Sequence, residues 1–265
     1  MRSSSPMRLM TLLLFSQWLI AGECYAQNEN IITAQQLSRH PFTYANLFND
    51  NESNANNAIH QLDSIAQTNA TARPFCNVYY NSMKNIEMQI KDLDTGTKTF
   101  VQKFEKRFAD YFLRACVNQK NRDISASPEW QCFFSNPDAK SWQIVLLGVN
   151  AHVNVNIWQA LVTNFSEEEI HFYKKPMLSI QSSVTKVYDQ FFDTLLANNS
   201  YLKFINTFTV GFAKKVGERI LYKWRRRNVN LAIMYYHNQE KFKRRLAIVN
   251  RKKEKIDQRI LRYRS

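Results

Sequence analysis

Apolar side chains recur at spacings of three and four residues along most of the chain after Pro74, a spacing typical of amphipathic α-helices. The pattern predicts helices over roughly 83–93, 100–117, 139–164, 176–197, 202–237 and 239–262. Ser166 and Glu169 have the spacing of a capping box and mark a further helix start. We therefore expect an all-α fold, a single multi-helix domain of about six to eight helices with a basic C-terminal helix.

Composition agrees with long helices that have few breaks. The 265 residues include only 5 Gly and 6 Pro, which argues against a β-rich fold with many tight turns. Hydrophobic residues make up 45% of the chain and aromatic residues 13%, enough apolar surface to offset the entropy lost on folding. The chain as a whole is therefore expected to fold rather than to remain disordered.

The first 26 residues have the composition of a secretory signal peptide. Arg2 and Arg8 precede a mostly apolar run over residues 9–20. Cys24 and Ala26 then place small residues at the −3 and −1 positions of a cleavage site. The apolar run is too short for a comfortable membrane span, and no later segment is expected to cross a bilayer. We therefore expect cleavage near Ala26 and an exported chain, periplasmic or extracellular.

The sequence after the signal peptide divides into three parts. Residues 27–73 are polar and rich in Asn, and they predict an N-terminal arm with at most a short helix near 58–66. Residues 74–238 carry the pattern of the helical domain. Residues 239–265 predict a basic amphipathic helix at the C-terminus.

Positive charge is concentrated in the C-terminal fifth of the chain. The formal net charge is +14, and residues 214–264 contain 18 Lys and Arg against 4 Asp and Glu. Three interpretations of the last helix stay open: a packed helix whose charges are simply solvated, an interfacial helix on anionic lipid, or a nucleic-acid-binding helix. We rank them in that order, because an exported protein meets anionic lipid before it meets nucleic acid.

Three cysteines follow the signal peptide: Cys76, Cys116 and Cys132. An oxidising compartment permits a disulfide, and the polar, Pro-containing loop between Cys116 and Cys132 favours that pair. Three buried free thiols are the alternative. The sequence has no C-x-x-C pair and its five His are scattered, so no metal site and no cofactor are expected.

The most unusual polar sequence is Gly-Val-Asn-Ala-His-Val-Asn-Val-Asn over residues 148–156. Its alternation would suit a strand, but the flanking residues continue the helical pattern, so we expect a helix. On a helix, Asn150 and Asn154 share one face, while His152 and Asn156 share another face at the apolar stripe. Polar groups that point into a core must be hydrogen-bonded, since each unpaired group costs about 1–3 kcal/mol.

Two interpretations of this motif stay open. In the first, its side chains only satisfy backbone groups of neighbouring segments and fix the register of the helix. In the second, His152 is a catalytic general base in a cleft between helices, and Asn150, Asn154 and Asn156 bind the ligand.

Residues outside the motif enter the second interpretation. Arg227 lies in the apolar stripe of the helix predicted over 202–237, and it is a further ligand-binding candidate. A carboxylate partner for His152 would have to come from Asp110, Asp189 or Asp193, provided that the fold brings one of them close.

The segment over residues 147–156 resembles the signature of a bacterial exported family of unknown function, with the pattern Asn-Ala-His-Ile/Val-Asn-x-Asp/Asn. The resemblance covers about residues 74–235 and is loose outside the motif. It implies an all-helical domain with His152 and Asn154 as its signature, and it implies no established activity. Asn156 stands where the family usually has Asp, which removes the natural carboxylate partner of a histidine.

The sequence thus leads to two functions from different classes. The first is a non-enzymatic exported helical protein, a binding module for a small or lipid-like ligand or for an anionic membrane surface. The alternative is a hydrolase-type enzyme that uses His152 in an interhelical cleft. An enzyme needs an open pocket at this ring with a carboxylate, hydroxyl or metal in reach, whereas a structural motif needs a buried ring.

Overall fold

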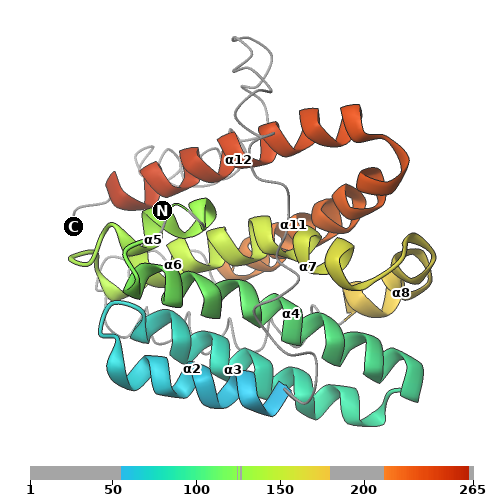
Figure 1. Ribbon diagram of the computed structural model, residues 1–265, viewed down its shortest axis with the longest axis horizontal. Coiled ribbons are helices and arrows are strands. Elements are labelled where there is room, and N and C mark those ends of the chain that lie inside the picture. Colours follow the sequence, from blue (N-terminus) through green and yellow to red (C-terminus); the bar gives the residue numbers. More distant parts are fainter. Residues whose placement is uncertain (1–54, 124, 126, 180–211, 263–265) are drawn as a thin grey trace, which may run out of the picture. The chain divides into compact units, whose positions relative to one another are not determined.

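A computed structural model describes residues 55–123, 125, 127–179 and 212–262 (Figure 1). Within these ranges the regular elements are helices and no strand occurs, so the all-α prediction is confirmed. The described residues belong to one compact unit. The signal peptide predicted over residues 1–26 lies outside the described residues.

The α-helices follow one another along the chain as α2 (Ala55–Thr68), α3 (Arg73–Gln89), α4 (Thr95–Lys120), α5 (Gln131–Phe134), α6 (Ser141–Ala151), α7 (Ile157–Asn164), α8 (Glu167–Ser179), α11 (Phe212–His237) and α12 (Gln239–Arg262). Short 3-10 turns, η2 (Ile90–Asp92) and η4 (Pro128–Trp130), follow α3 and precede α5. A π-helix, η5 (His152–Asn156), joins α6 to α7. We call the continuous segment α6–η5–α7 the central helix.

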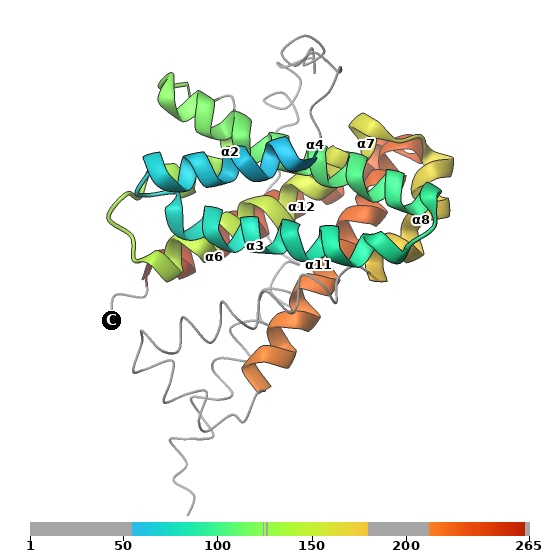
Figure 2. The same ribbon diagram turned by 90° about the horizontal axis from the view of Figure 1, so that it is seen from below.

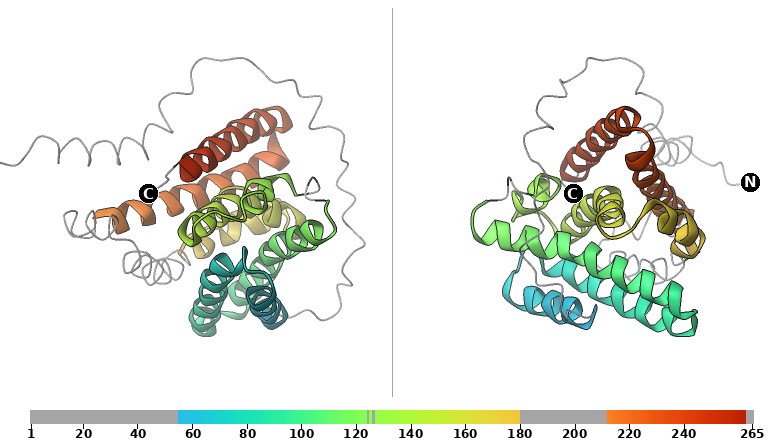
Figure 3. Two further views of the ribbon diagram at one scale, coloured as in Figure 1. Left: turned by 90° about the vertical axis from the view of Figure 1, so that its left-hand side faces the viewer. Right: turned by 45° about the vertical axis from the view of Figure 1, so that its right-hand side comes forward.

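The central helix lies between two groups of helices. Figure 1 shows α2, α3 and α4 on one side of it and α11 and α12 on the other, and the side view in Figure 3 agrees. Seen from the α2–α3 side in Figure 2, the central helix and α12 lie behind these helices. Helices α3 and α12 contact its first half, while α4 and α11 contact its second half. The central helix is therefore packed against protein from both sides.

Burial explains why the central helix is so apolar. Within the described residues, Ser141–Asn164 is the one helix long and apolar enough to cross a membrane, and 78% of its most apolar window is buried inside the domain. The expectation that no segment after the signal peptide could cross a bilayer is therefore wrong for length and composition alone. A core helix meets the same criterion as a membrane span, because both have apolar surroundings.

The domain begins earlier than the composition indicated. Helix α2 (Ala55–Thr68) is longer than the short helix expected near 58–66, and it packs on α3 and α4 with Leu62 fully buried. The folded part therefore starts within the segment predicted as a polar arm over 27–73. Phe242, Leu246, Val249 and Ile260 of α12 are buried too, so the C-terminal helix is part of this domain.

Local sequence signals set several helix ends. Asp94 precedes α4, and its side chain accepts a hydrogen bond from Thr97 N at 2.9 Å. The capping box predicted at α8 is confirmed: Ser166 N donates to Glu169 Oε2 at 2.8 Å, and Glu169 N donates to Ser166 Oγ at 3.3 Å. Helix α8 continues through Pro176, and the helix predicted over 176–197 lies mostly outside the described residues.

Candidate functional site

The motif over residues 148–156 lies on a helix, as expected, but the helix widens there into the π-helix η5. The side chain of Asn228 from α11 reaches this wider turn, and its Nδ2 lies 3.2 Å from both Val153 O and Asn154 O. The same amide donates to Trp224 O, one turn back in its own helix, at 2.9 Å. A side chain of α11 thus satisfies carbonyl groups of a turn type that is frequent at functional sites.

Asn150 connects the motif to α12. Its Nδ2 donates to Lys253 O at 2.9 Å and to Asp257 Oδ1 at 2.8 Å. Lys253 and Asp257 also pair with each other, with 2.6 Å between Lys253 Nζ and Asp257 Oδ2. Burial raises the pKa of the Asp257 carboxyl, and the pairing with Lys253 opposes that rise. The buried charge of Lys253 is therefore balanced by the carboxylate of Asp257, one turn later in the same helix.

Asn154 connects the motif to α11. Its Nδ2 donates to Asn150 Oδ1 at 2.9 Å, which confirms that the two amides share a face. Its Oδ1 accepts a hydrogen bond from the guanidinium of Arg227. The structure thus brings Arg227 to the motif, where it serves as a hydrogen-bond partner of an asparagine that is fully buried.

Asn156 connects the motif to η4 and the first turn of α7. Its Oδ1 accepts from Trp130 Nε1 at 3.1 Å, while its Nδ2 donates to Glu129 Oε1 at 2.9 Å and to Gln159 Oε1 at 2.7 Å. Burial raises the pKa of Glu129, and the hydrogen bond from Asn156 opposes that rise. An ionised aspartate at this position has no hydrogen to donate to Glu129, whereas the amide of Asn156 donates to its carboxylate.

The His152 ring is enclosed by aromatic side chains. It is 2% exposed, and it stacks on Phe108 with 3.5 Å between ring centroids and 11° between ring planes. Tyr79 lies 4.6 Å away, centroid to centroid, and Trp130 lies 5.7 Å away. Asn156 Oδ1 is 3.4 Å from Nδ1 of the imidazole, whereas Nε2 has no hydrogen-bond partner among the described residues.

This enclosure decides the protonation state of the imidazole. Burial lowers the pKa of His152 to about 3; the contact with Asn156 opposes the shift, and the Arg225 guanidinium adds to it. The ring is therefore neutral near neutral pH and a weak base. These features favour the structural interpretation of the motif.

Three further ionisable side chains lie in the interior near this ring, and sequence analysis did not identify them. They are Tyr79 of α3, Glu105 of α4 and Arg225 of α11. Burial raises the pKa of Glu105 to about 7 against the opposing charge of Arg225. Burial also raises the pKa of Tyr79 and lowers that of Arg225. Arg225 donates to Met177 O at 3.3 Å, which ties α11 to α8.

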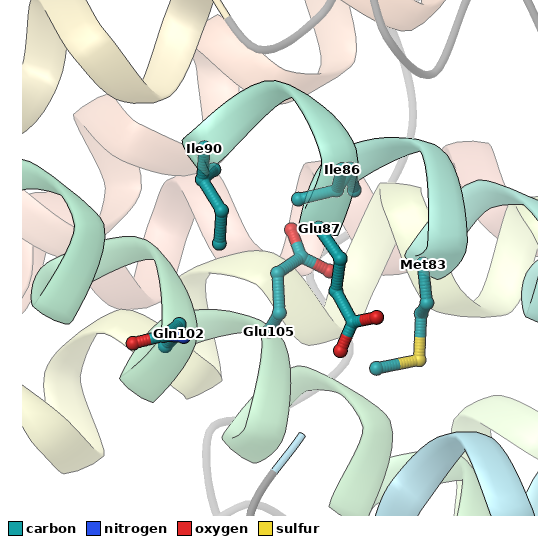
Figure 4. Close-up of a pocket in the computed structure, with 6 residues that line it drawn as sticks. All are labelled: Met83, Ile86, Glu87, Ile90, Gln102 and Glu105. Carbon is teal, nitrogen blue, oxygen red and sulfur yellow. The ribbon is translucent and has the colours of Figure 1, made fainter. Parts of the chain in front are cut away.

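A small hollow between α3 and α4 adjoins this interior group. Figure 4 shows the carboxylate of Glu105 pointing from α4 toward the residues of α3 and η2. The lining consists of Met83, Ile86, Glu87, Ile90, Gln102 and Glu105. Its volume of about 10 Å³ is room for about one water molecule. It is too small for a substrate, and His152 does not line it.

Of the three carboxylates considered as partners for His152, Asp110 is the one that lies among the described residues, and its described ion pair is with another side chain. Asp110 pairs with Arg107, with 3.7 Å between Oδ2 and Nη1. Asp189 and Asp193 lie outside the described residues. The amide of Asn156 is thus the polar side chain that contacts the ring within the described part of the chain.

The Cys116–Cys132 disulfide favoured from the sequence is wrong, because all three cysteines of the described residues are free thiols. The thiol of Cys116 has Cys76 as a neighbour, whereas Cys132 lies against Asp257 of α12, so the favoured pair faces different parts of the fold. Burial raises the pKa of Cys76 to about 12 and that of Cys132 to about 11. Thiols with such pKa values are poor nucleophiles.

The motif also holds α12 in place through Asn150, and the outer face of α12 carries many exposed cations. Its exposed cations are Lys241, Lys243, Arg244, Arg245, Arg251, Lys255 and Arg262. Glu240 and Glu254 are the exposed acidic residues of the same helix. We call this surface the α12 basic face.

Comparison with known proteins places the whole described domain in one family. A model of the family of unknown function DUF5995 matches residues 55–262, a range that contains every helix from α2 to α12. The match is wider than the resemblance found from the motif, which covered about residues 74–235. No curated protein and no solved structure matches the chain.

Proposed function

Since the chain belongs to the DUF5995 family, whose function is unknown, we propose a function from its structure: an exported, non-enzymatic binding module that docks electrostatically on an anionic membrane through the α12 basic face. The observation that carries the proposal is the outward row of cations on a helix whose other side is fixed to the core. Its export is inferred from the signal-like residues 1–26.

The orientation of α12 is fixed by buried polar contacts as well as by apolar packing. Phe242, Leu246, Val249 and Ile260 are buried. Gln143 Nε2 donates to Ile260 O at 2.8 Å near one end of α12, and Asn150 holds Lys253 and Asp257 in its middle. Breaking such buried hydrogen bonds costs about 1–3 kcal/mol for each group left unpaired. Rotation of the cations toward the core is therefore strongly disfavoured.

This packing determines how α12 would meet a membrane. An interfacial helix that inserts its apolar stripe needs that stripe free, but here the domain covers it. The domain would instead bind the membrane electrostatically, through its exposed cations. Each Lys or Arg near an anionic surface contributes on the order of 1 kcal/mol to the free energy of binding. The interaction is then sensitive to salt, because mobile ions screen exposed charges beyond a Debye length of about 8–10 Å.

The alternative, a hydrolase that uses His152, has less support. The ring is buried, its pKa is far below the neutral range, and it lines neither the hollow beside Glu105 nor the groove lined by His171, Lys174 and Tyr222. A catalytic His152 would require a path from solvent that opens during turnover. Neither of these two hollows supplies that path.

Charge reversal on α12 tests the proposal. The triple variant Lys243→Glu, Arg244→Glu and Arg245→Glu is expected to bind vesicles of phosphatidylglycerol and phosphatidylcholine on the order of 100-fold more weakly than the unmodified chain, since three favourable contributions are lost. Co-sedimentation at low and high salt measures this. A matched control, Lys91→Glu, Lys103→Glu and Lys120→Glu, makes the same charge change on exposed residues of η2 and α4. It is expected to keep most of the binding.

Three results would contradict the membrane proposal. One is equal binding by both triple variants, and another is binding to pure phosphatidylcholine vesicles that matches binding to the anionic ones. A third is negligible vesicle binding by the unmodified chain together with tight binding to duplex DNA, which would instead make nucleic acid the partner. Deletion of residues 239–265 is not a suitable test, because α12 covers part of the core.

Export is tested separately. Expression with residues 1–26 in a bacterial host is expected to yield a periplasmic or secreted protein whose mass corresponds to a chain that starts at Gln27. The variant Ala26→Arg should block this cleavage, because the −1 position needs a small residue. Recovery of the intact chain from the cytoplasm alone would contradict an exported location.

A further inference from the structure

Two histidines and one glutamate from different helices converge at the edge of the domain. Glu167 and His171 lie one turn apart at the start of α8, and His237 is the last residue of α11. One ligand atom from each residue, a carboxylate oxygen or an imidazole nitrogen, lies within 4.8 Å of the other two. His171 Nε2 is 3.5 Å from Glu167 Oε1, and the same oxygen contacts His237 Nε2.

We propose that Glu167, His171 and His237 form a binding site for a divalent d-block cation, with Zn²⁺ as the best match. Imidazole nitrogen and carboxylate oxygen are ligands that Zn²⁺ prefers in proteins, and three protein ligands leave one position of a tetrahedron open. Ca²⁺ and Mg²⁺ fit less well, because these hard cations take oxygen ligands. The site is separate from the α12 basic face and goes beyond the proposed function.

The fold holds the two helices that supply these ligands in register. Tyr236, next to His237, donates through its hydroxyl to Phe165 O at 2.7 Å and also contacts Val162 O at 3.2 Å. Ile170, next to His171, is 1% exposed and anchors α8 in the core. The backbone on both sides of the site is thus fixed before any cation arrives, which reduces the ordering cost of binding.

The three side chains are accessible to an ion from solution. Those of His171 and His237 are 53% and 62% exposed, and that of Glu167 is 24% exposed. His171 also lines an open groove with Lys174, Lys175 and Tyr222. A bound cation would connect α8 to the end of α11, so it would raise the thermal stability of the domain.

Titration of the metal-free full chain with Zn²⁺ tests the site. We expect saturable binding with one cation per chain, accompanied by a rise in Tm. The variants His171→Ala and His237→Ala are each expected to weaken this binding by at least ~10-fold, since loss of a direct ligand costs no less than loss of a supporting one. His60→Ala removes an exposed histidine on α2 and should bind like the unmodified chain.

Spectroscopy of the Co²⁺-loaded chain adds a readout that stability alone does not change. Its visible absorption should report nitrogen and oxygen ligation and should be lost in both variants. The proposal would be overturned by absence of saturable Zn²⁺ binding, by equal binding in His171→Ala and the unmodified chain, or by Ca²⁺ binding as tightly as Zn²⁺. Circular dichroism confirms that the variants are folded, which their exposed positions lead us to expect.

Discussion

His152→Ala is expected to lower the free energy of unfolding by about 3 kcal/mol near pH 7.5, because it leaves a cavity where a fully packed ring stood. The imidazole stacks on Phe108 and contacts Tyr79, so its removal takes away ring contacts from both α4 and α3. Denaturant unfolding followed by circular dichroism measures the difference. A catalytic residue in an open cleft would instead leave stability nearly unchanged.

The effect of this substitution should shrink as the pH falls. The pKa of His152 is about 3 in the folded chain, whereas its ordinary value is 6.5, so protons bind the unfolded chain preferentially between these values. The folded state therefore keeps its full advantage above about pH 6.5 and loses it progressively toward pH 3. Alanine cannot titrate, so the difference between the two proteins should fall by about 2 kcal/mol from about pH 7.5 to pH 5.

His152→Phe is the matched control for this prediction. Phenylalanine fills most of the same space and does not titrate, so it should cost less than alanine near pH 7.5 while showing the same dependence on pH. Comparing the two variants separates the loss of packing from the loss of a titrating group. If both differences stay constant with pH, the ring is reached by solvent in solution and the structural interpretation of the motif fails.

Gly148→Ala is expected to destabilise the domain by about 3 kcal/mol, although alanine is the better helix former by about 1 kcal/mol. A Cβ at position 148 would lie 2.6 Å from Phe75 Cγ and 2.7 Å from Cε2, much closer than van der Waals contact. The Phe75 ring cannot yield easily, because four aromatic rings surround it at centroid distances of 4.9–5.8 Å. Thermal and denaturant unfolding measure the cost.

Two further variants keep this test decisive even if Gly148→Ala does not fold. In Gly96→Ala the new Cβ would meet the hydroxyl of Tyr173 at 2.9 Å, the far end of a side chain that can shift, so the cost should stay below about 1 kcal/mol. Phe75→Leu combined with Gly148→Ala should be more stable than the sum of the two single effects, since the smaller side chain makes room. Simple additivity would show that the clash is not the cause.

Residues whose environment is set by the local sequence were predictable. The helix predicted over 239–262 has those bounds in α12, and Asn150 and Asn154 share a face as their spacing indicated. Lys253 is buried in α12, where it pairs with Asp257, one turn later. The i,i+4 spacing of Lys253 and Asp257 in the sequence was sufficient to predict this ion pair.

Features that depend on other helices were not predictable. Arg225 stands in a run of basic residues that resembles a solvated face, and only the packing of α11 buries it near Glu105. The carbonyl groups of the π-helix in the motif are contacted by Asn228, more than seventy residues further along the chain. The scattered histidines of the sequence did not reveal the cluster of Glu167, His171 and His237, because His171 and His237 meet only when α11 packs on α8.

The wide turn within the central helix has a consequence for how this sequence can change. Each residue of an α-helix advances the side chains by about 100° around the helix axis. A π-turn holds one residue more than an α-turn, so the extra residue is taken up within the wide turn and α7 keeps the phase that it would have after a regular turn. A single-residue deletion within 152–156 is therefore expected to restore a regular helix and to leave Trp158 and Leu161 on their buried faces. The cost of such a deletion falls on the motif, because the side-chain contacts of Asn156 and the carbonyl groups that Asn228 reaches depend on the wide turn.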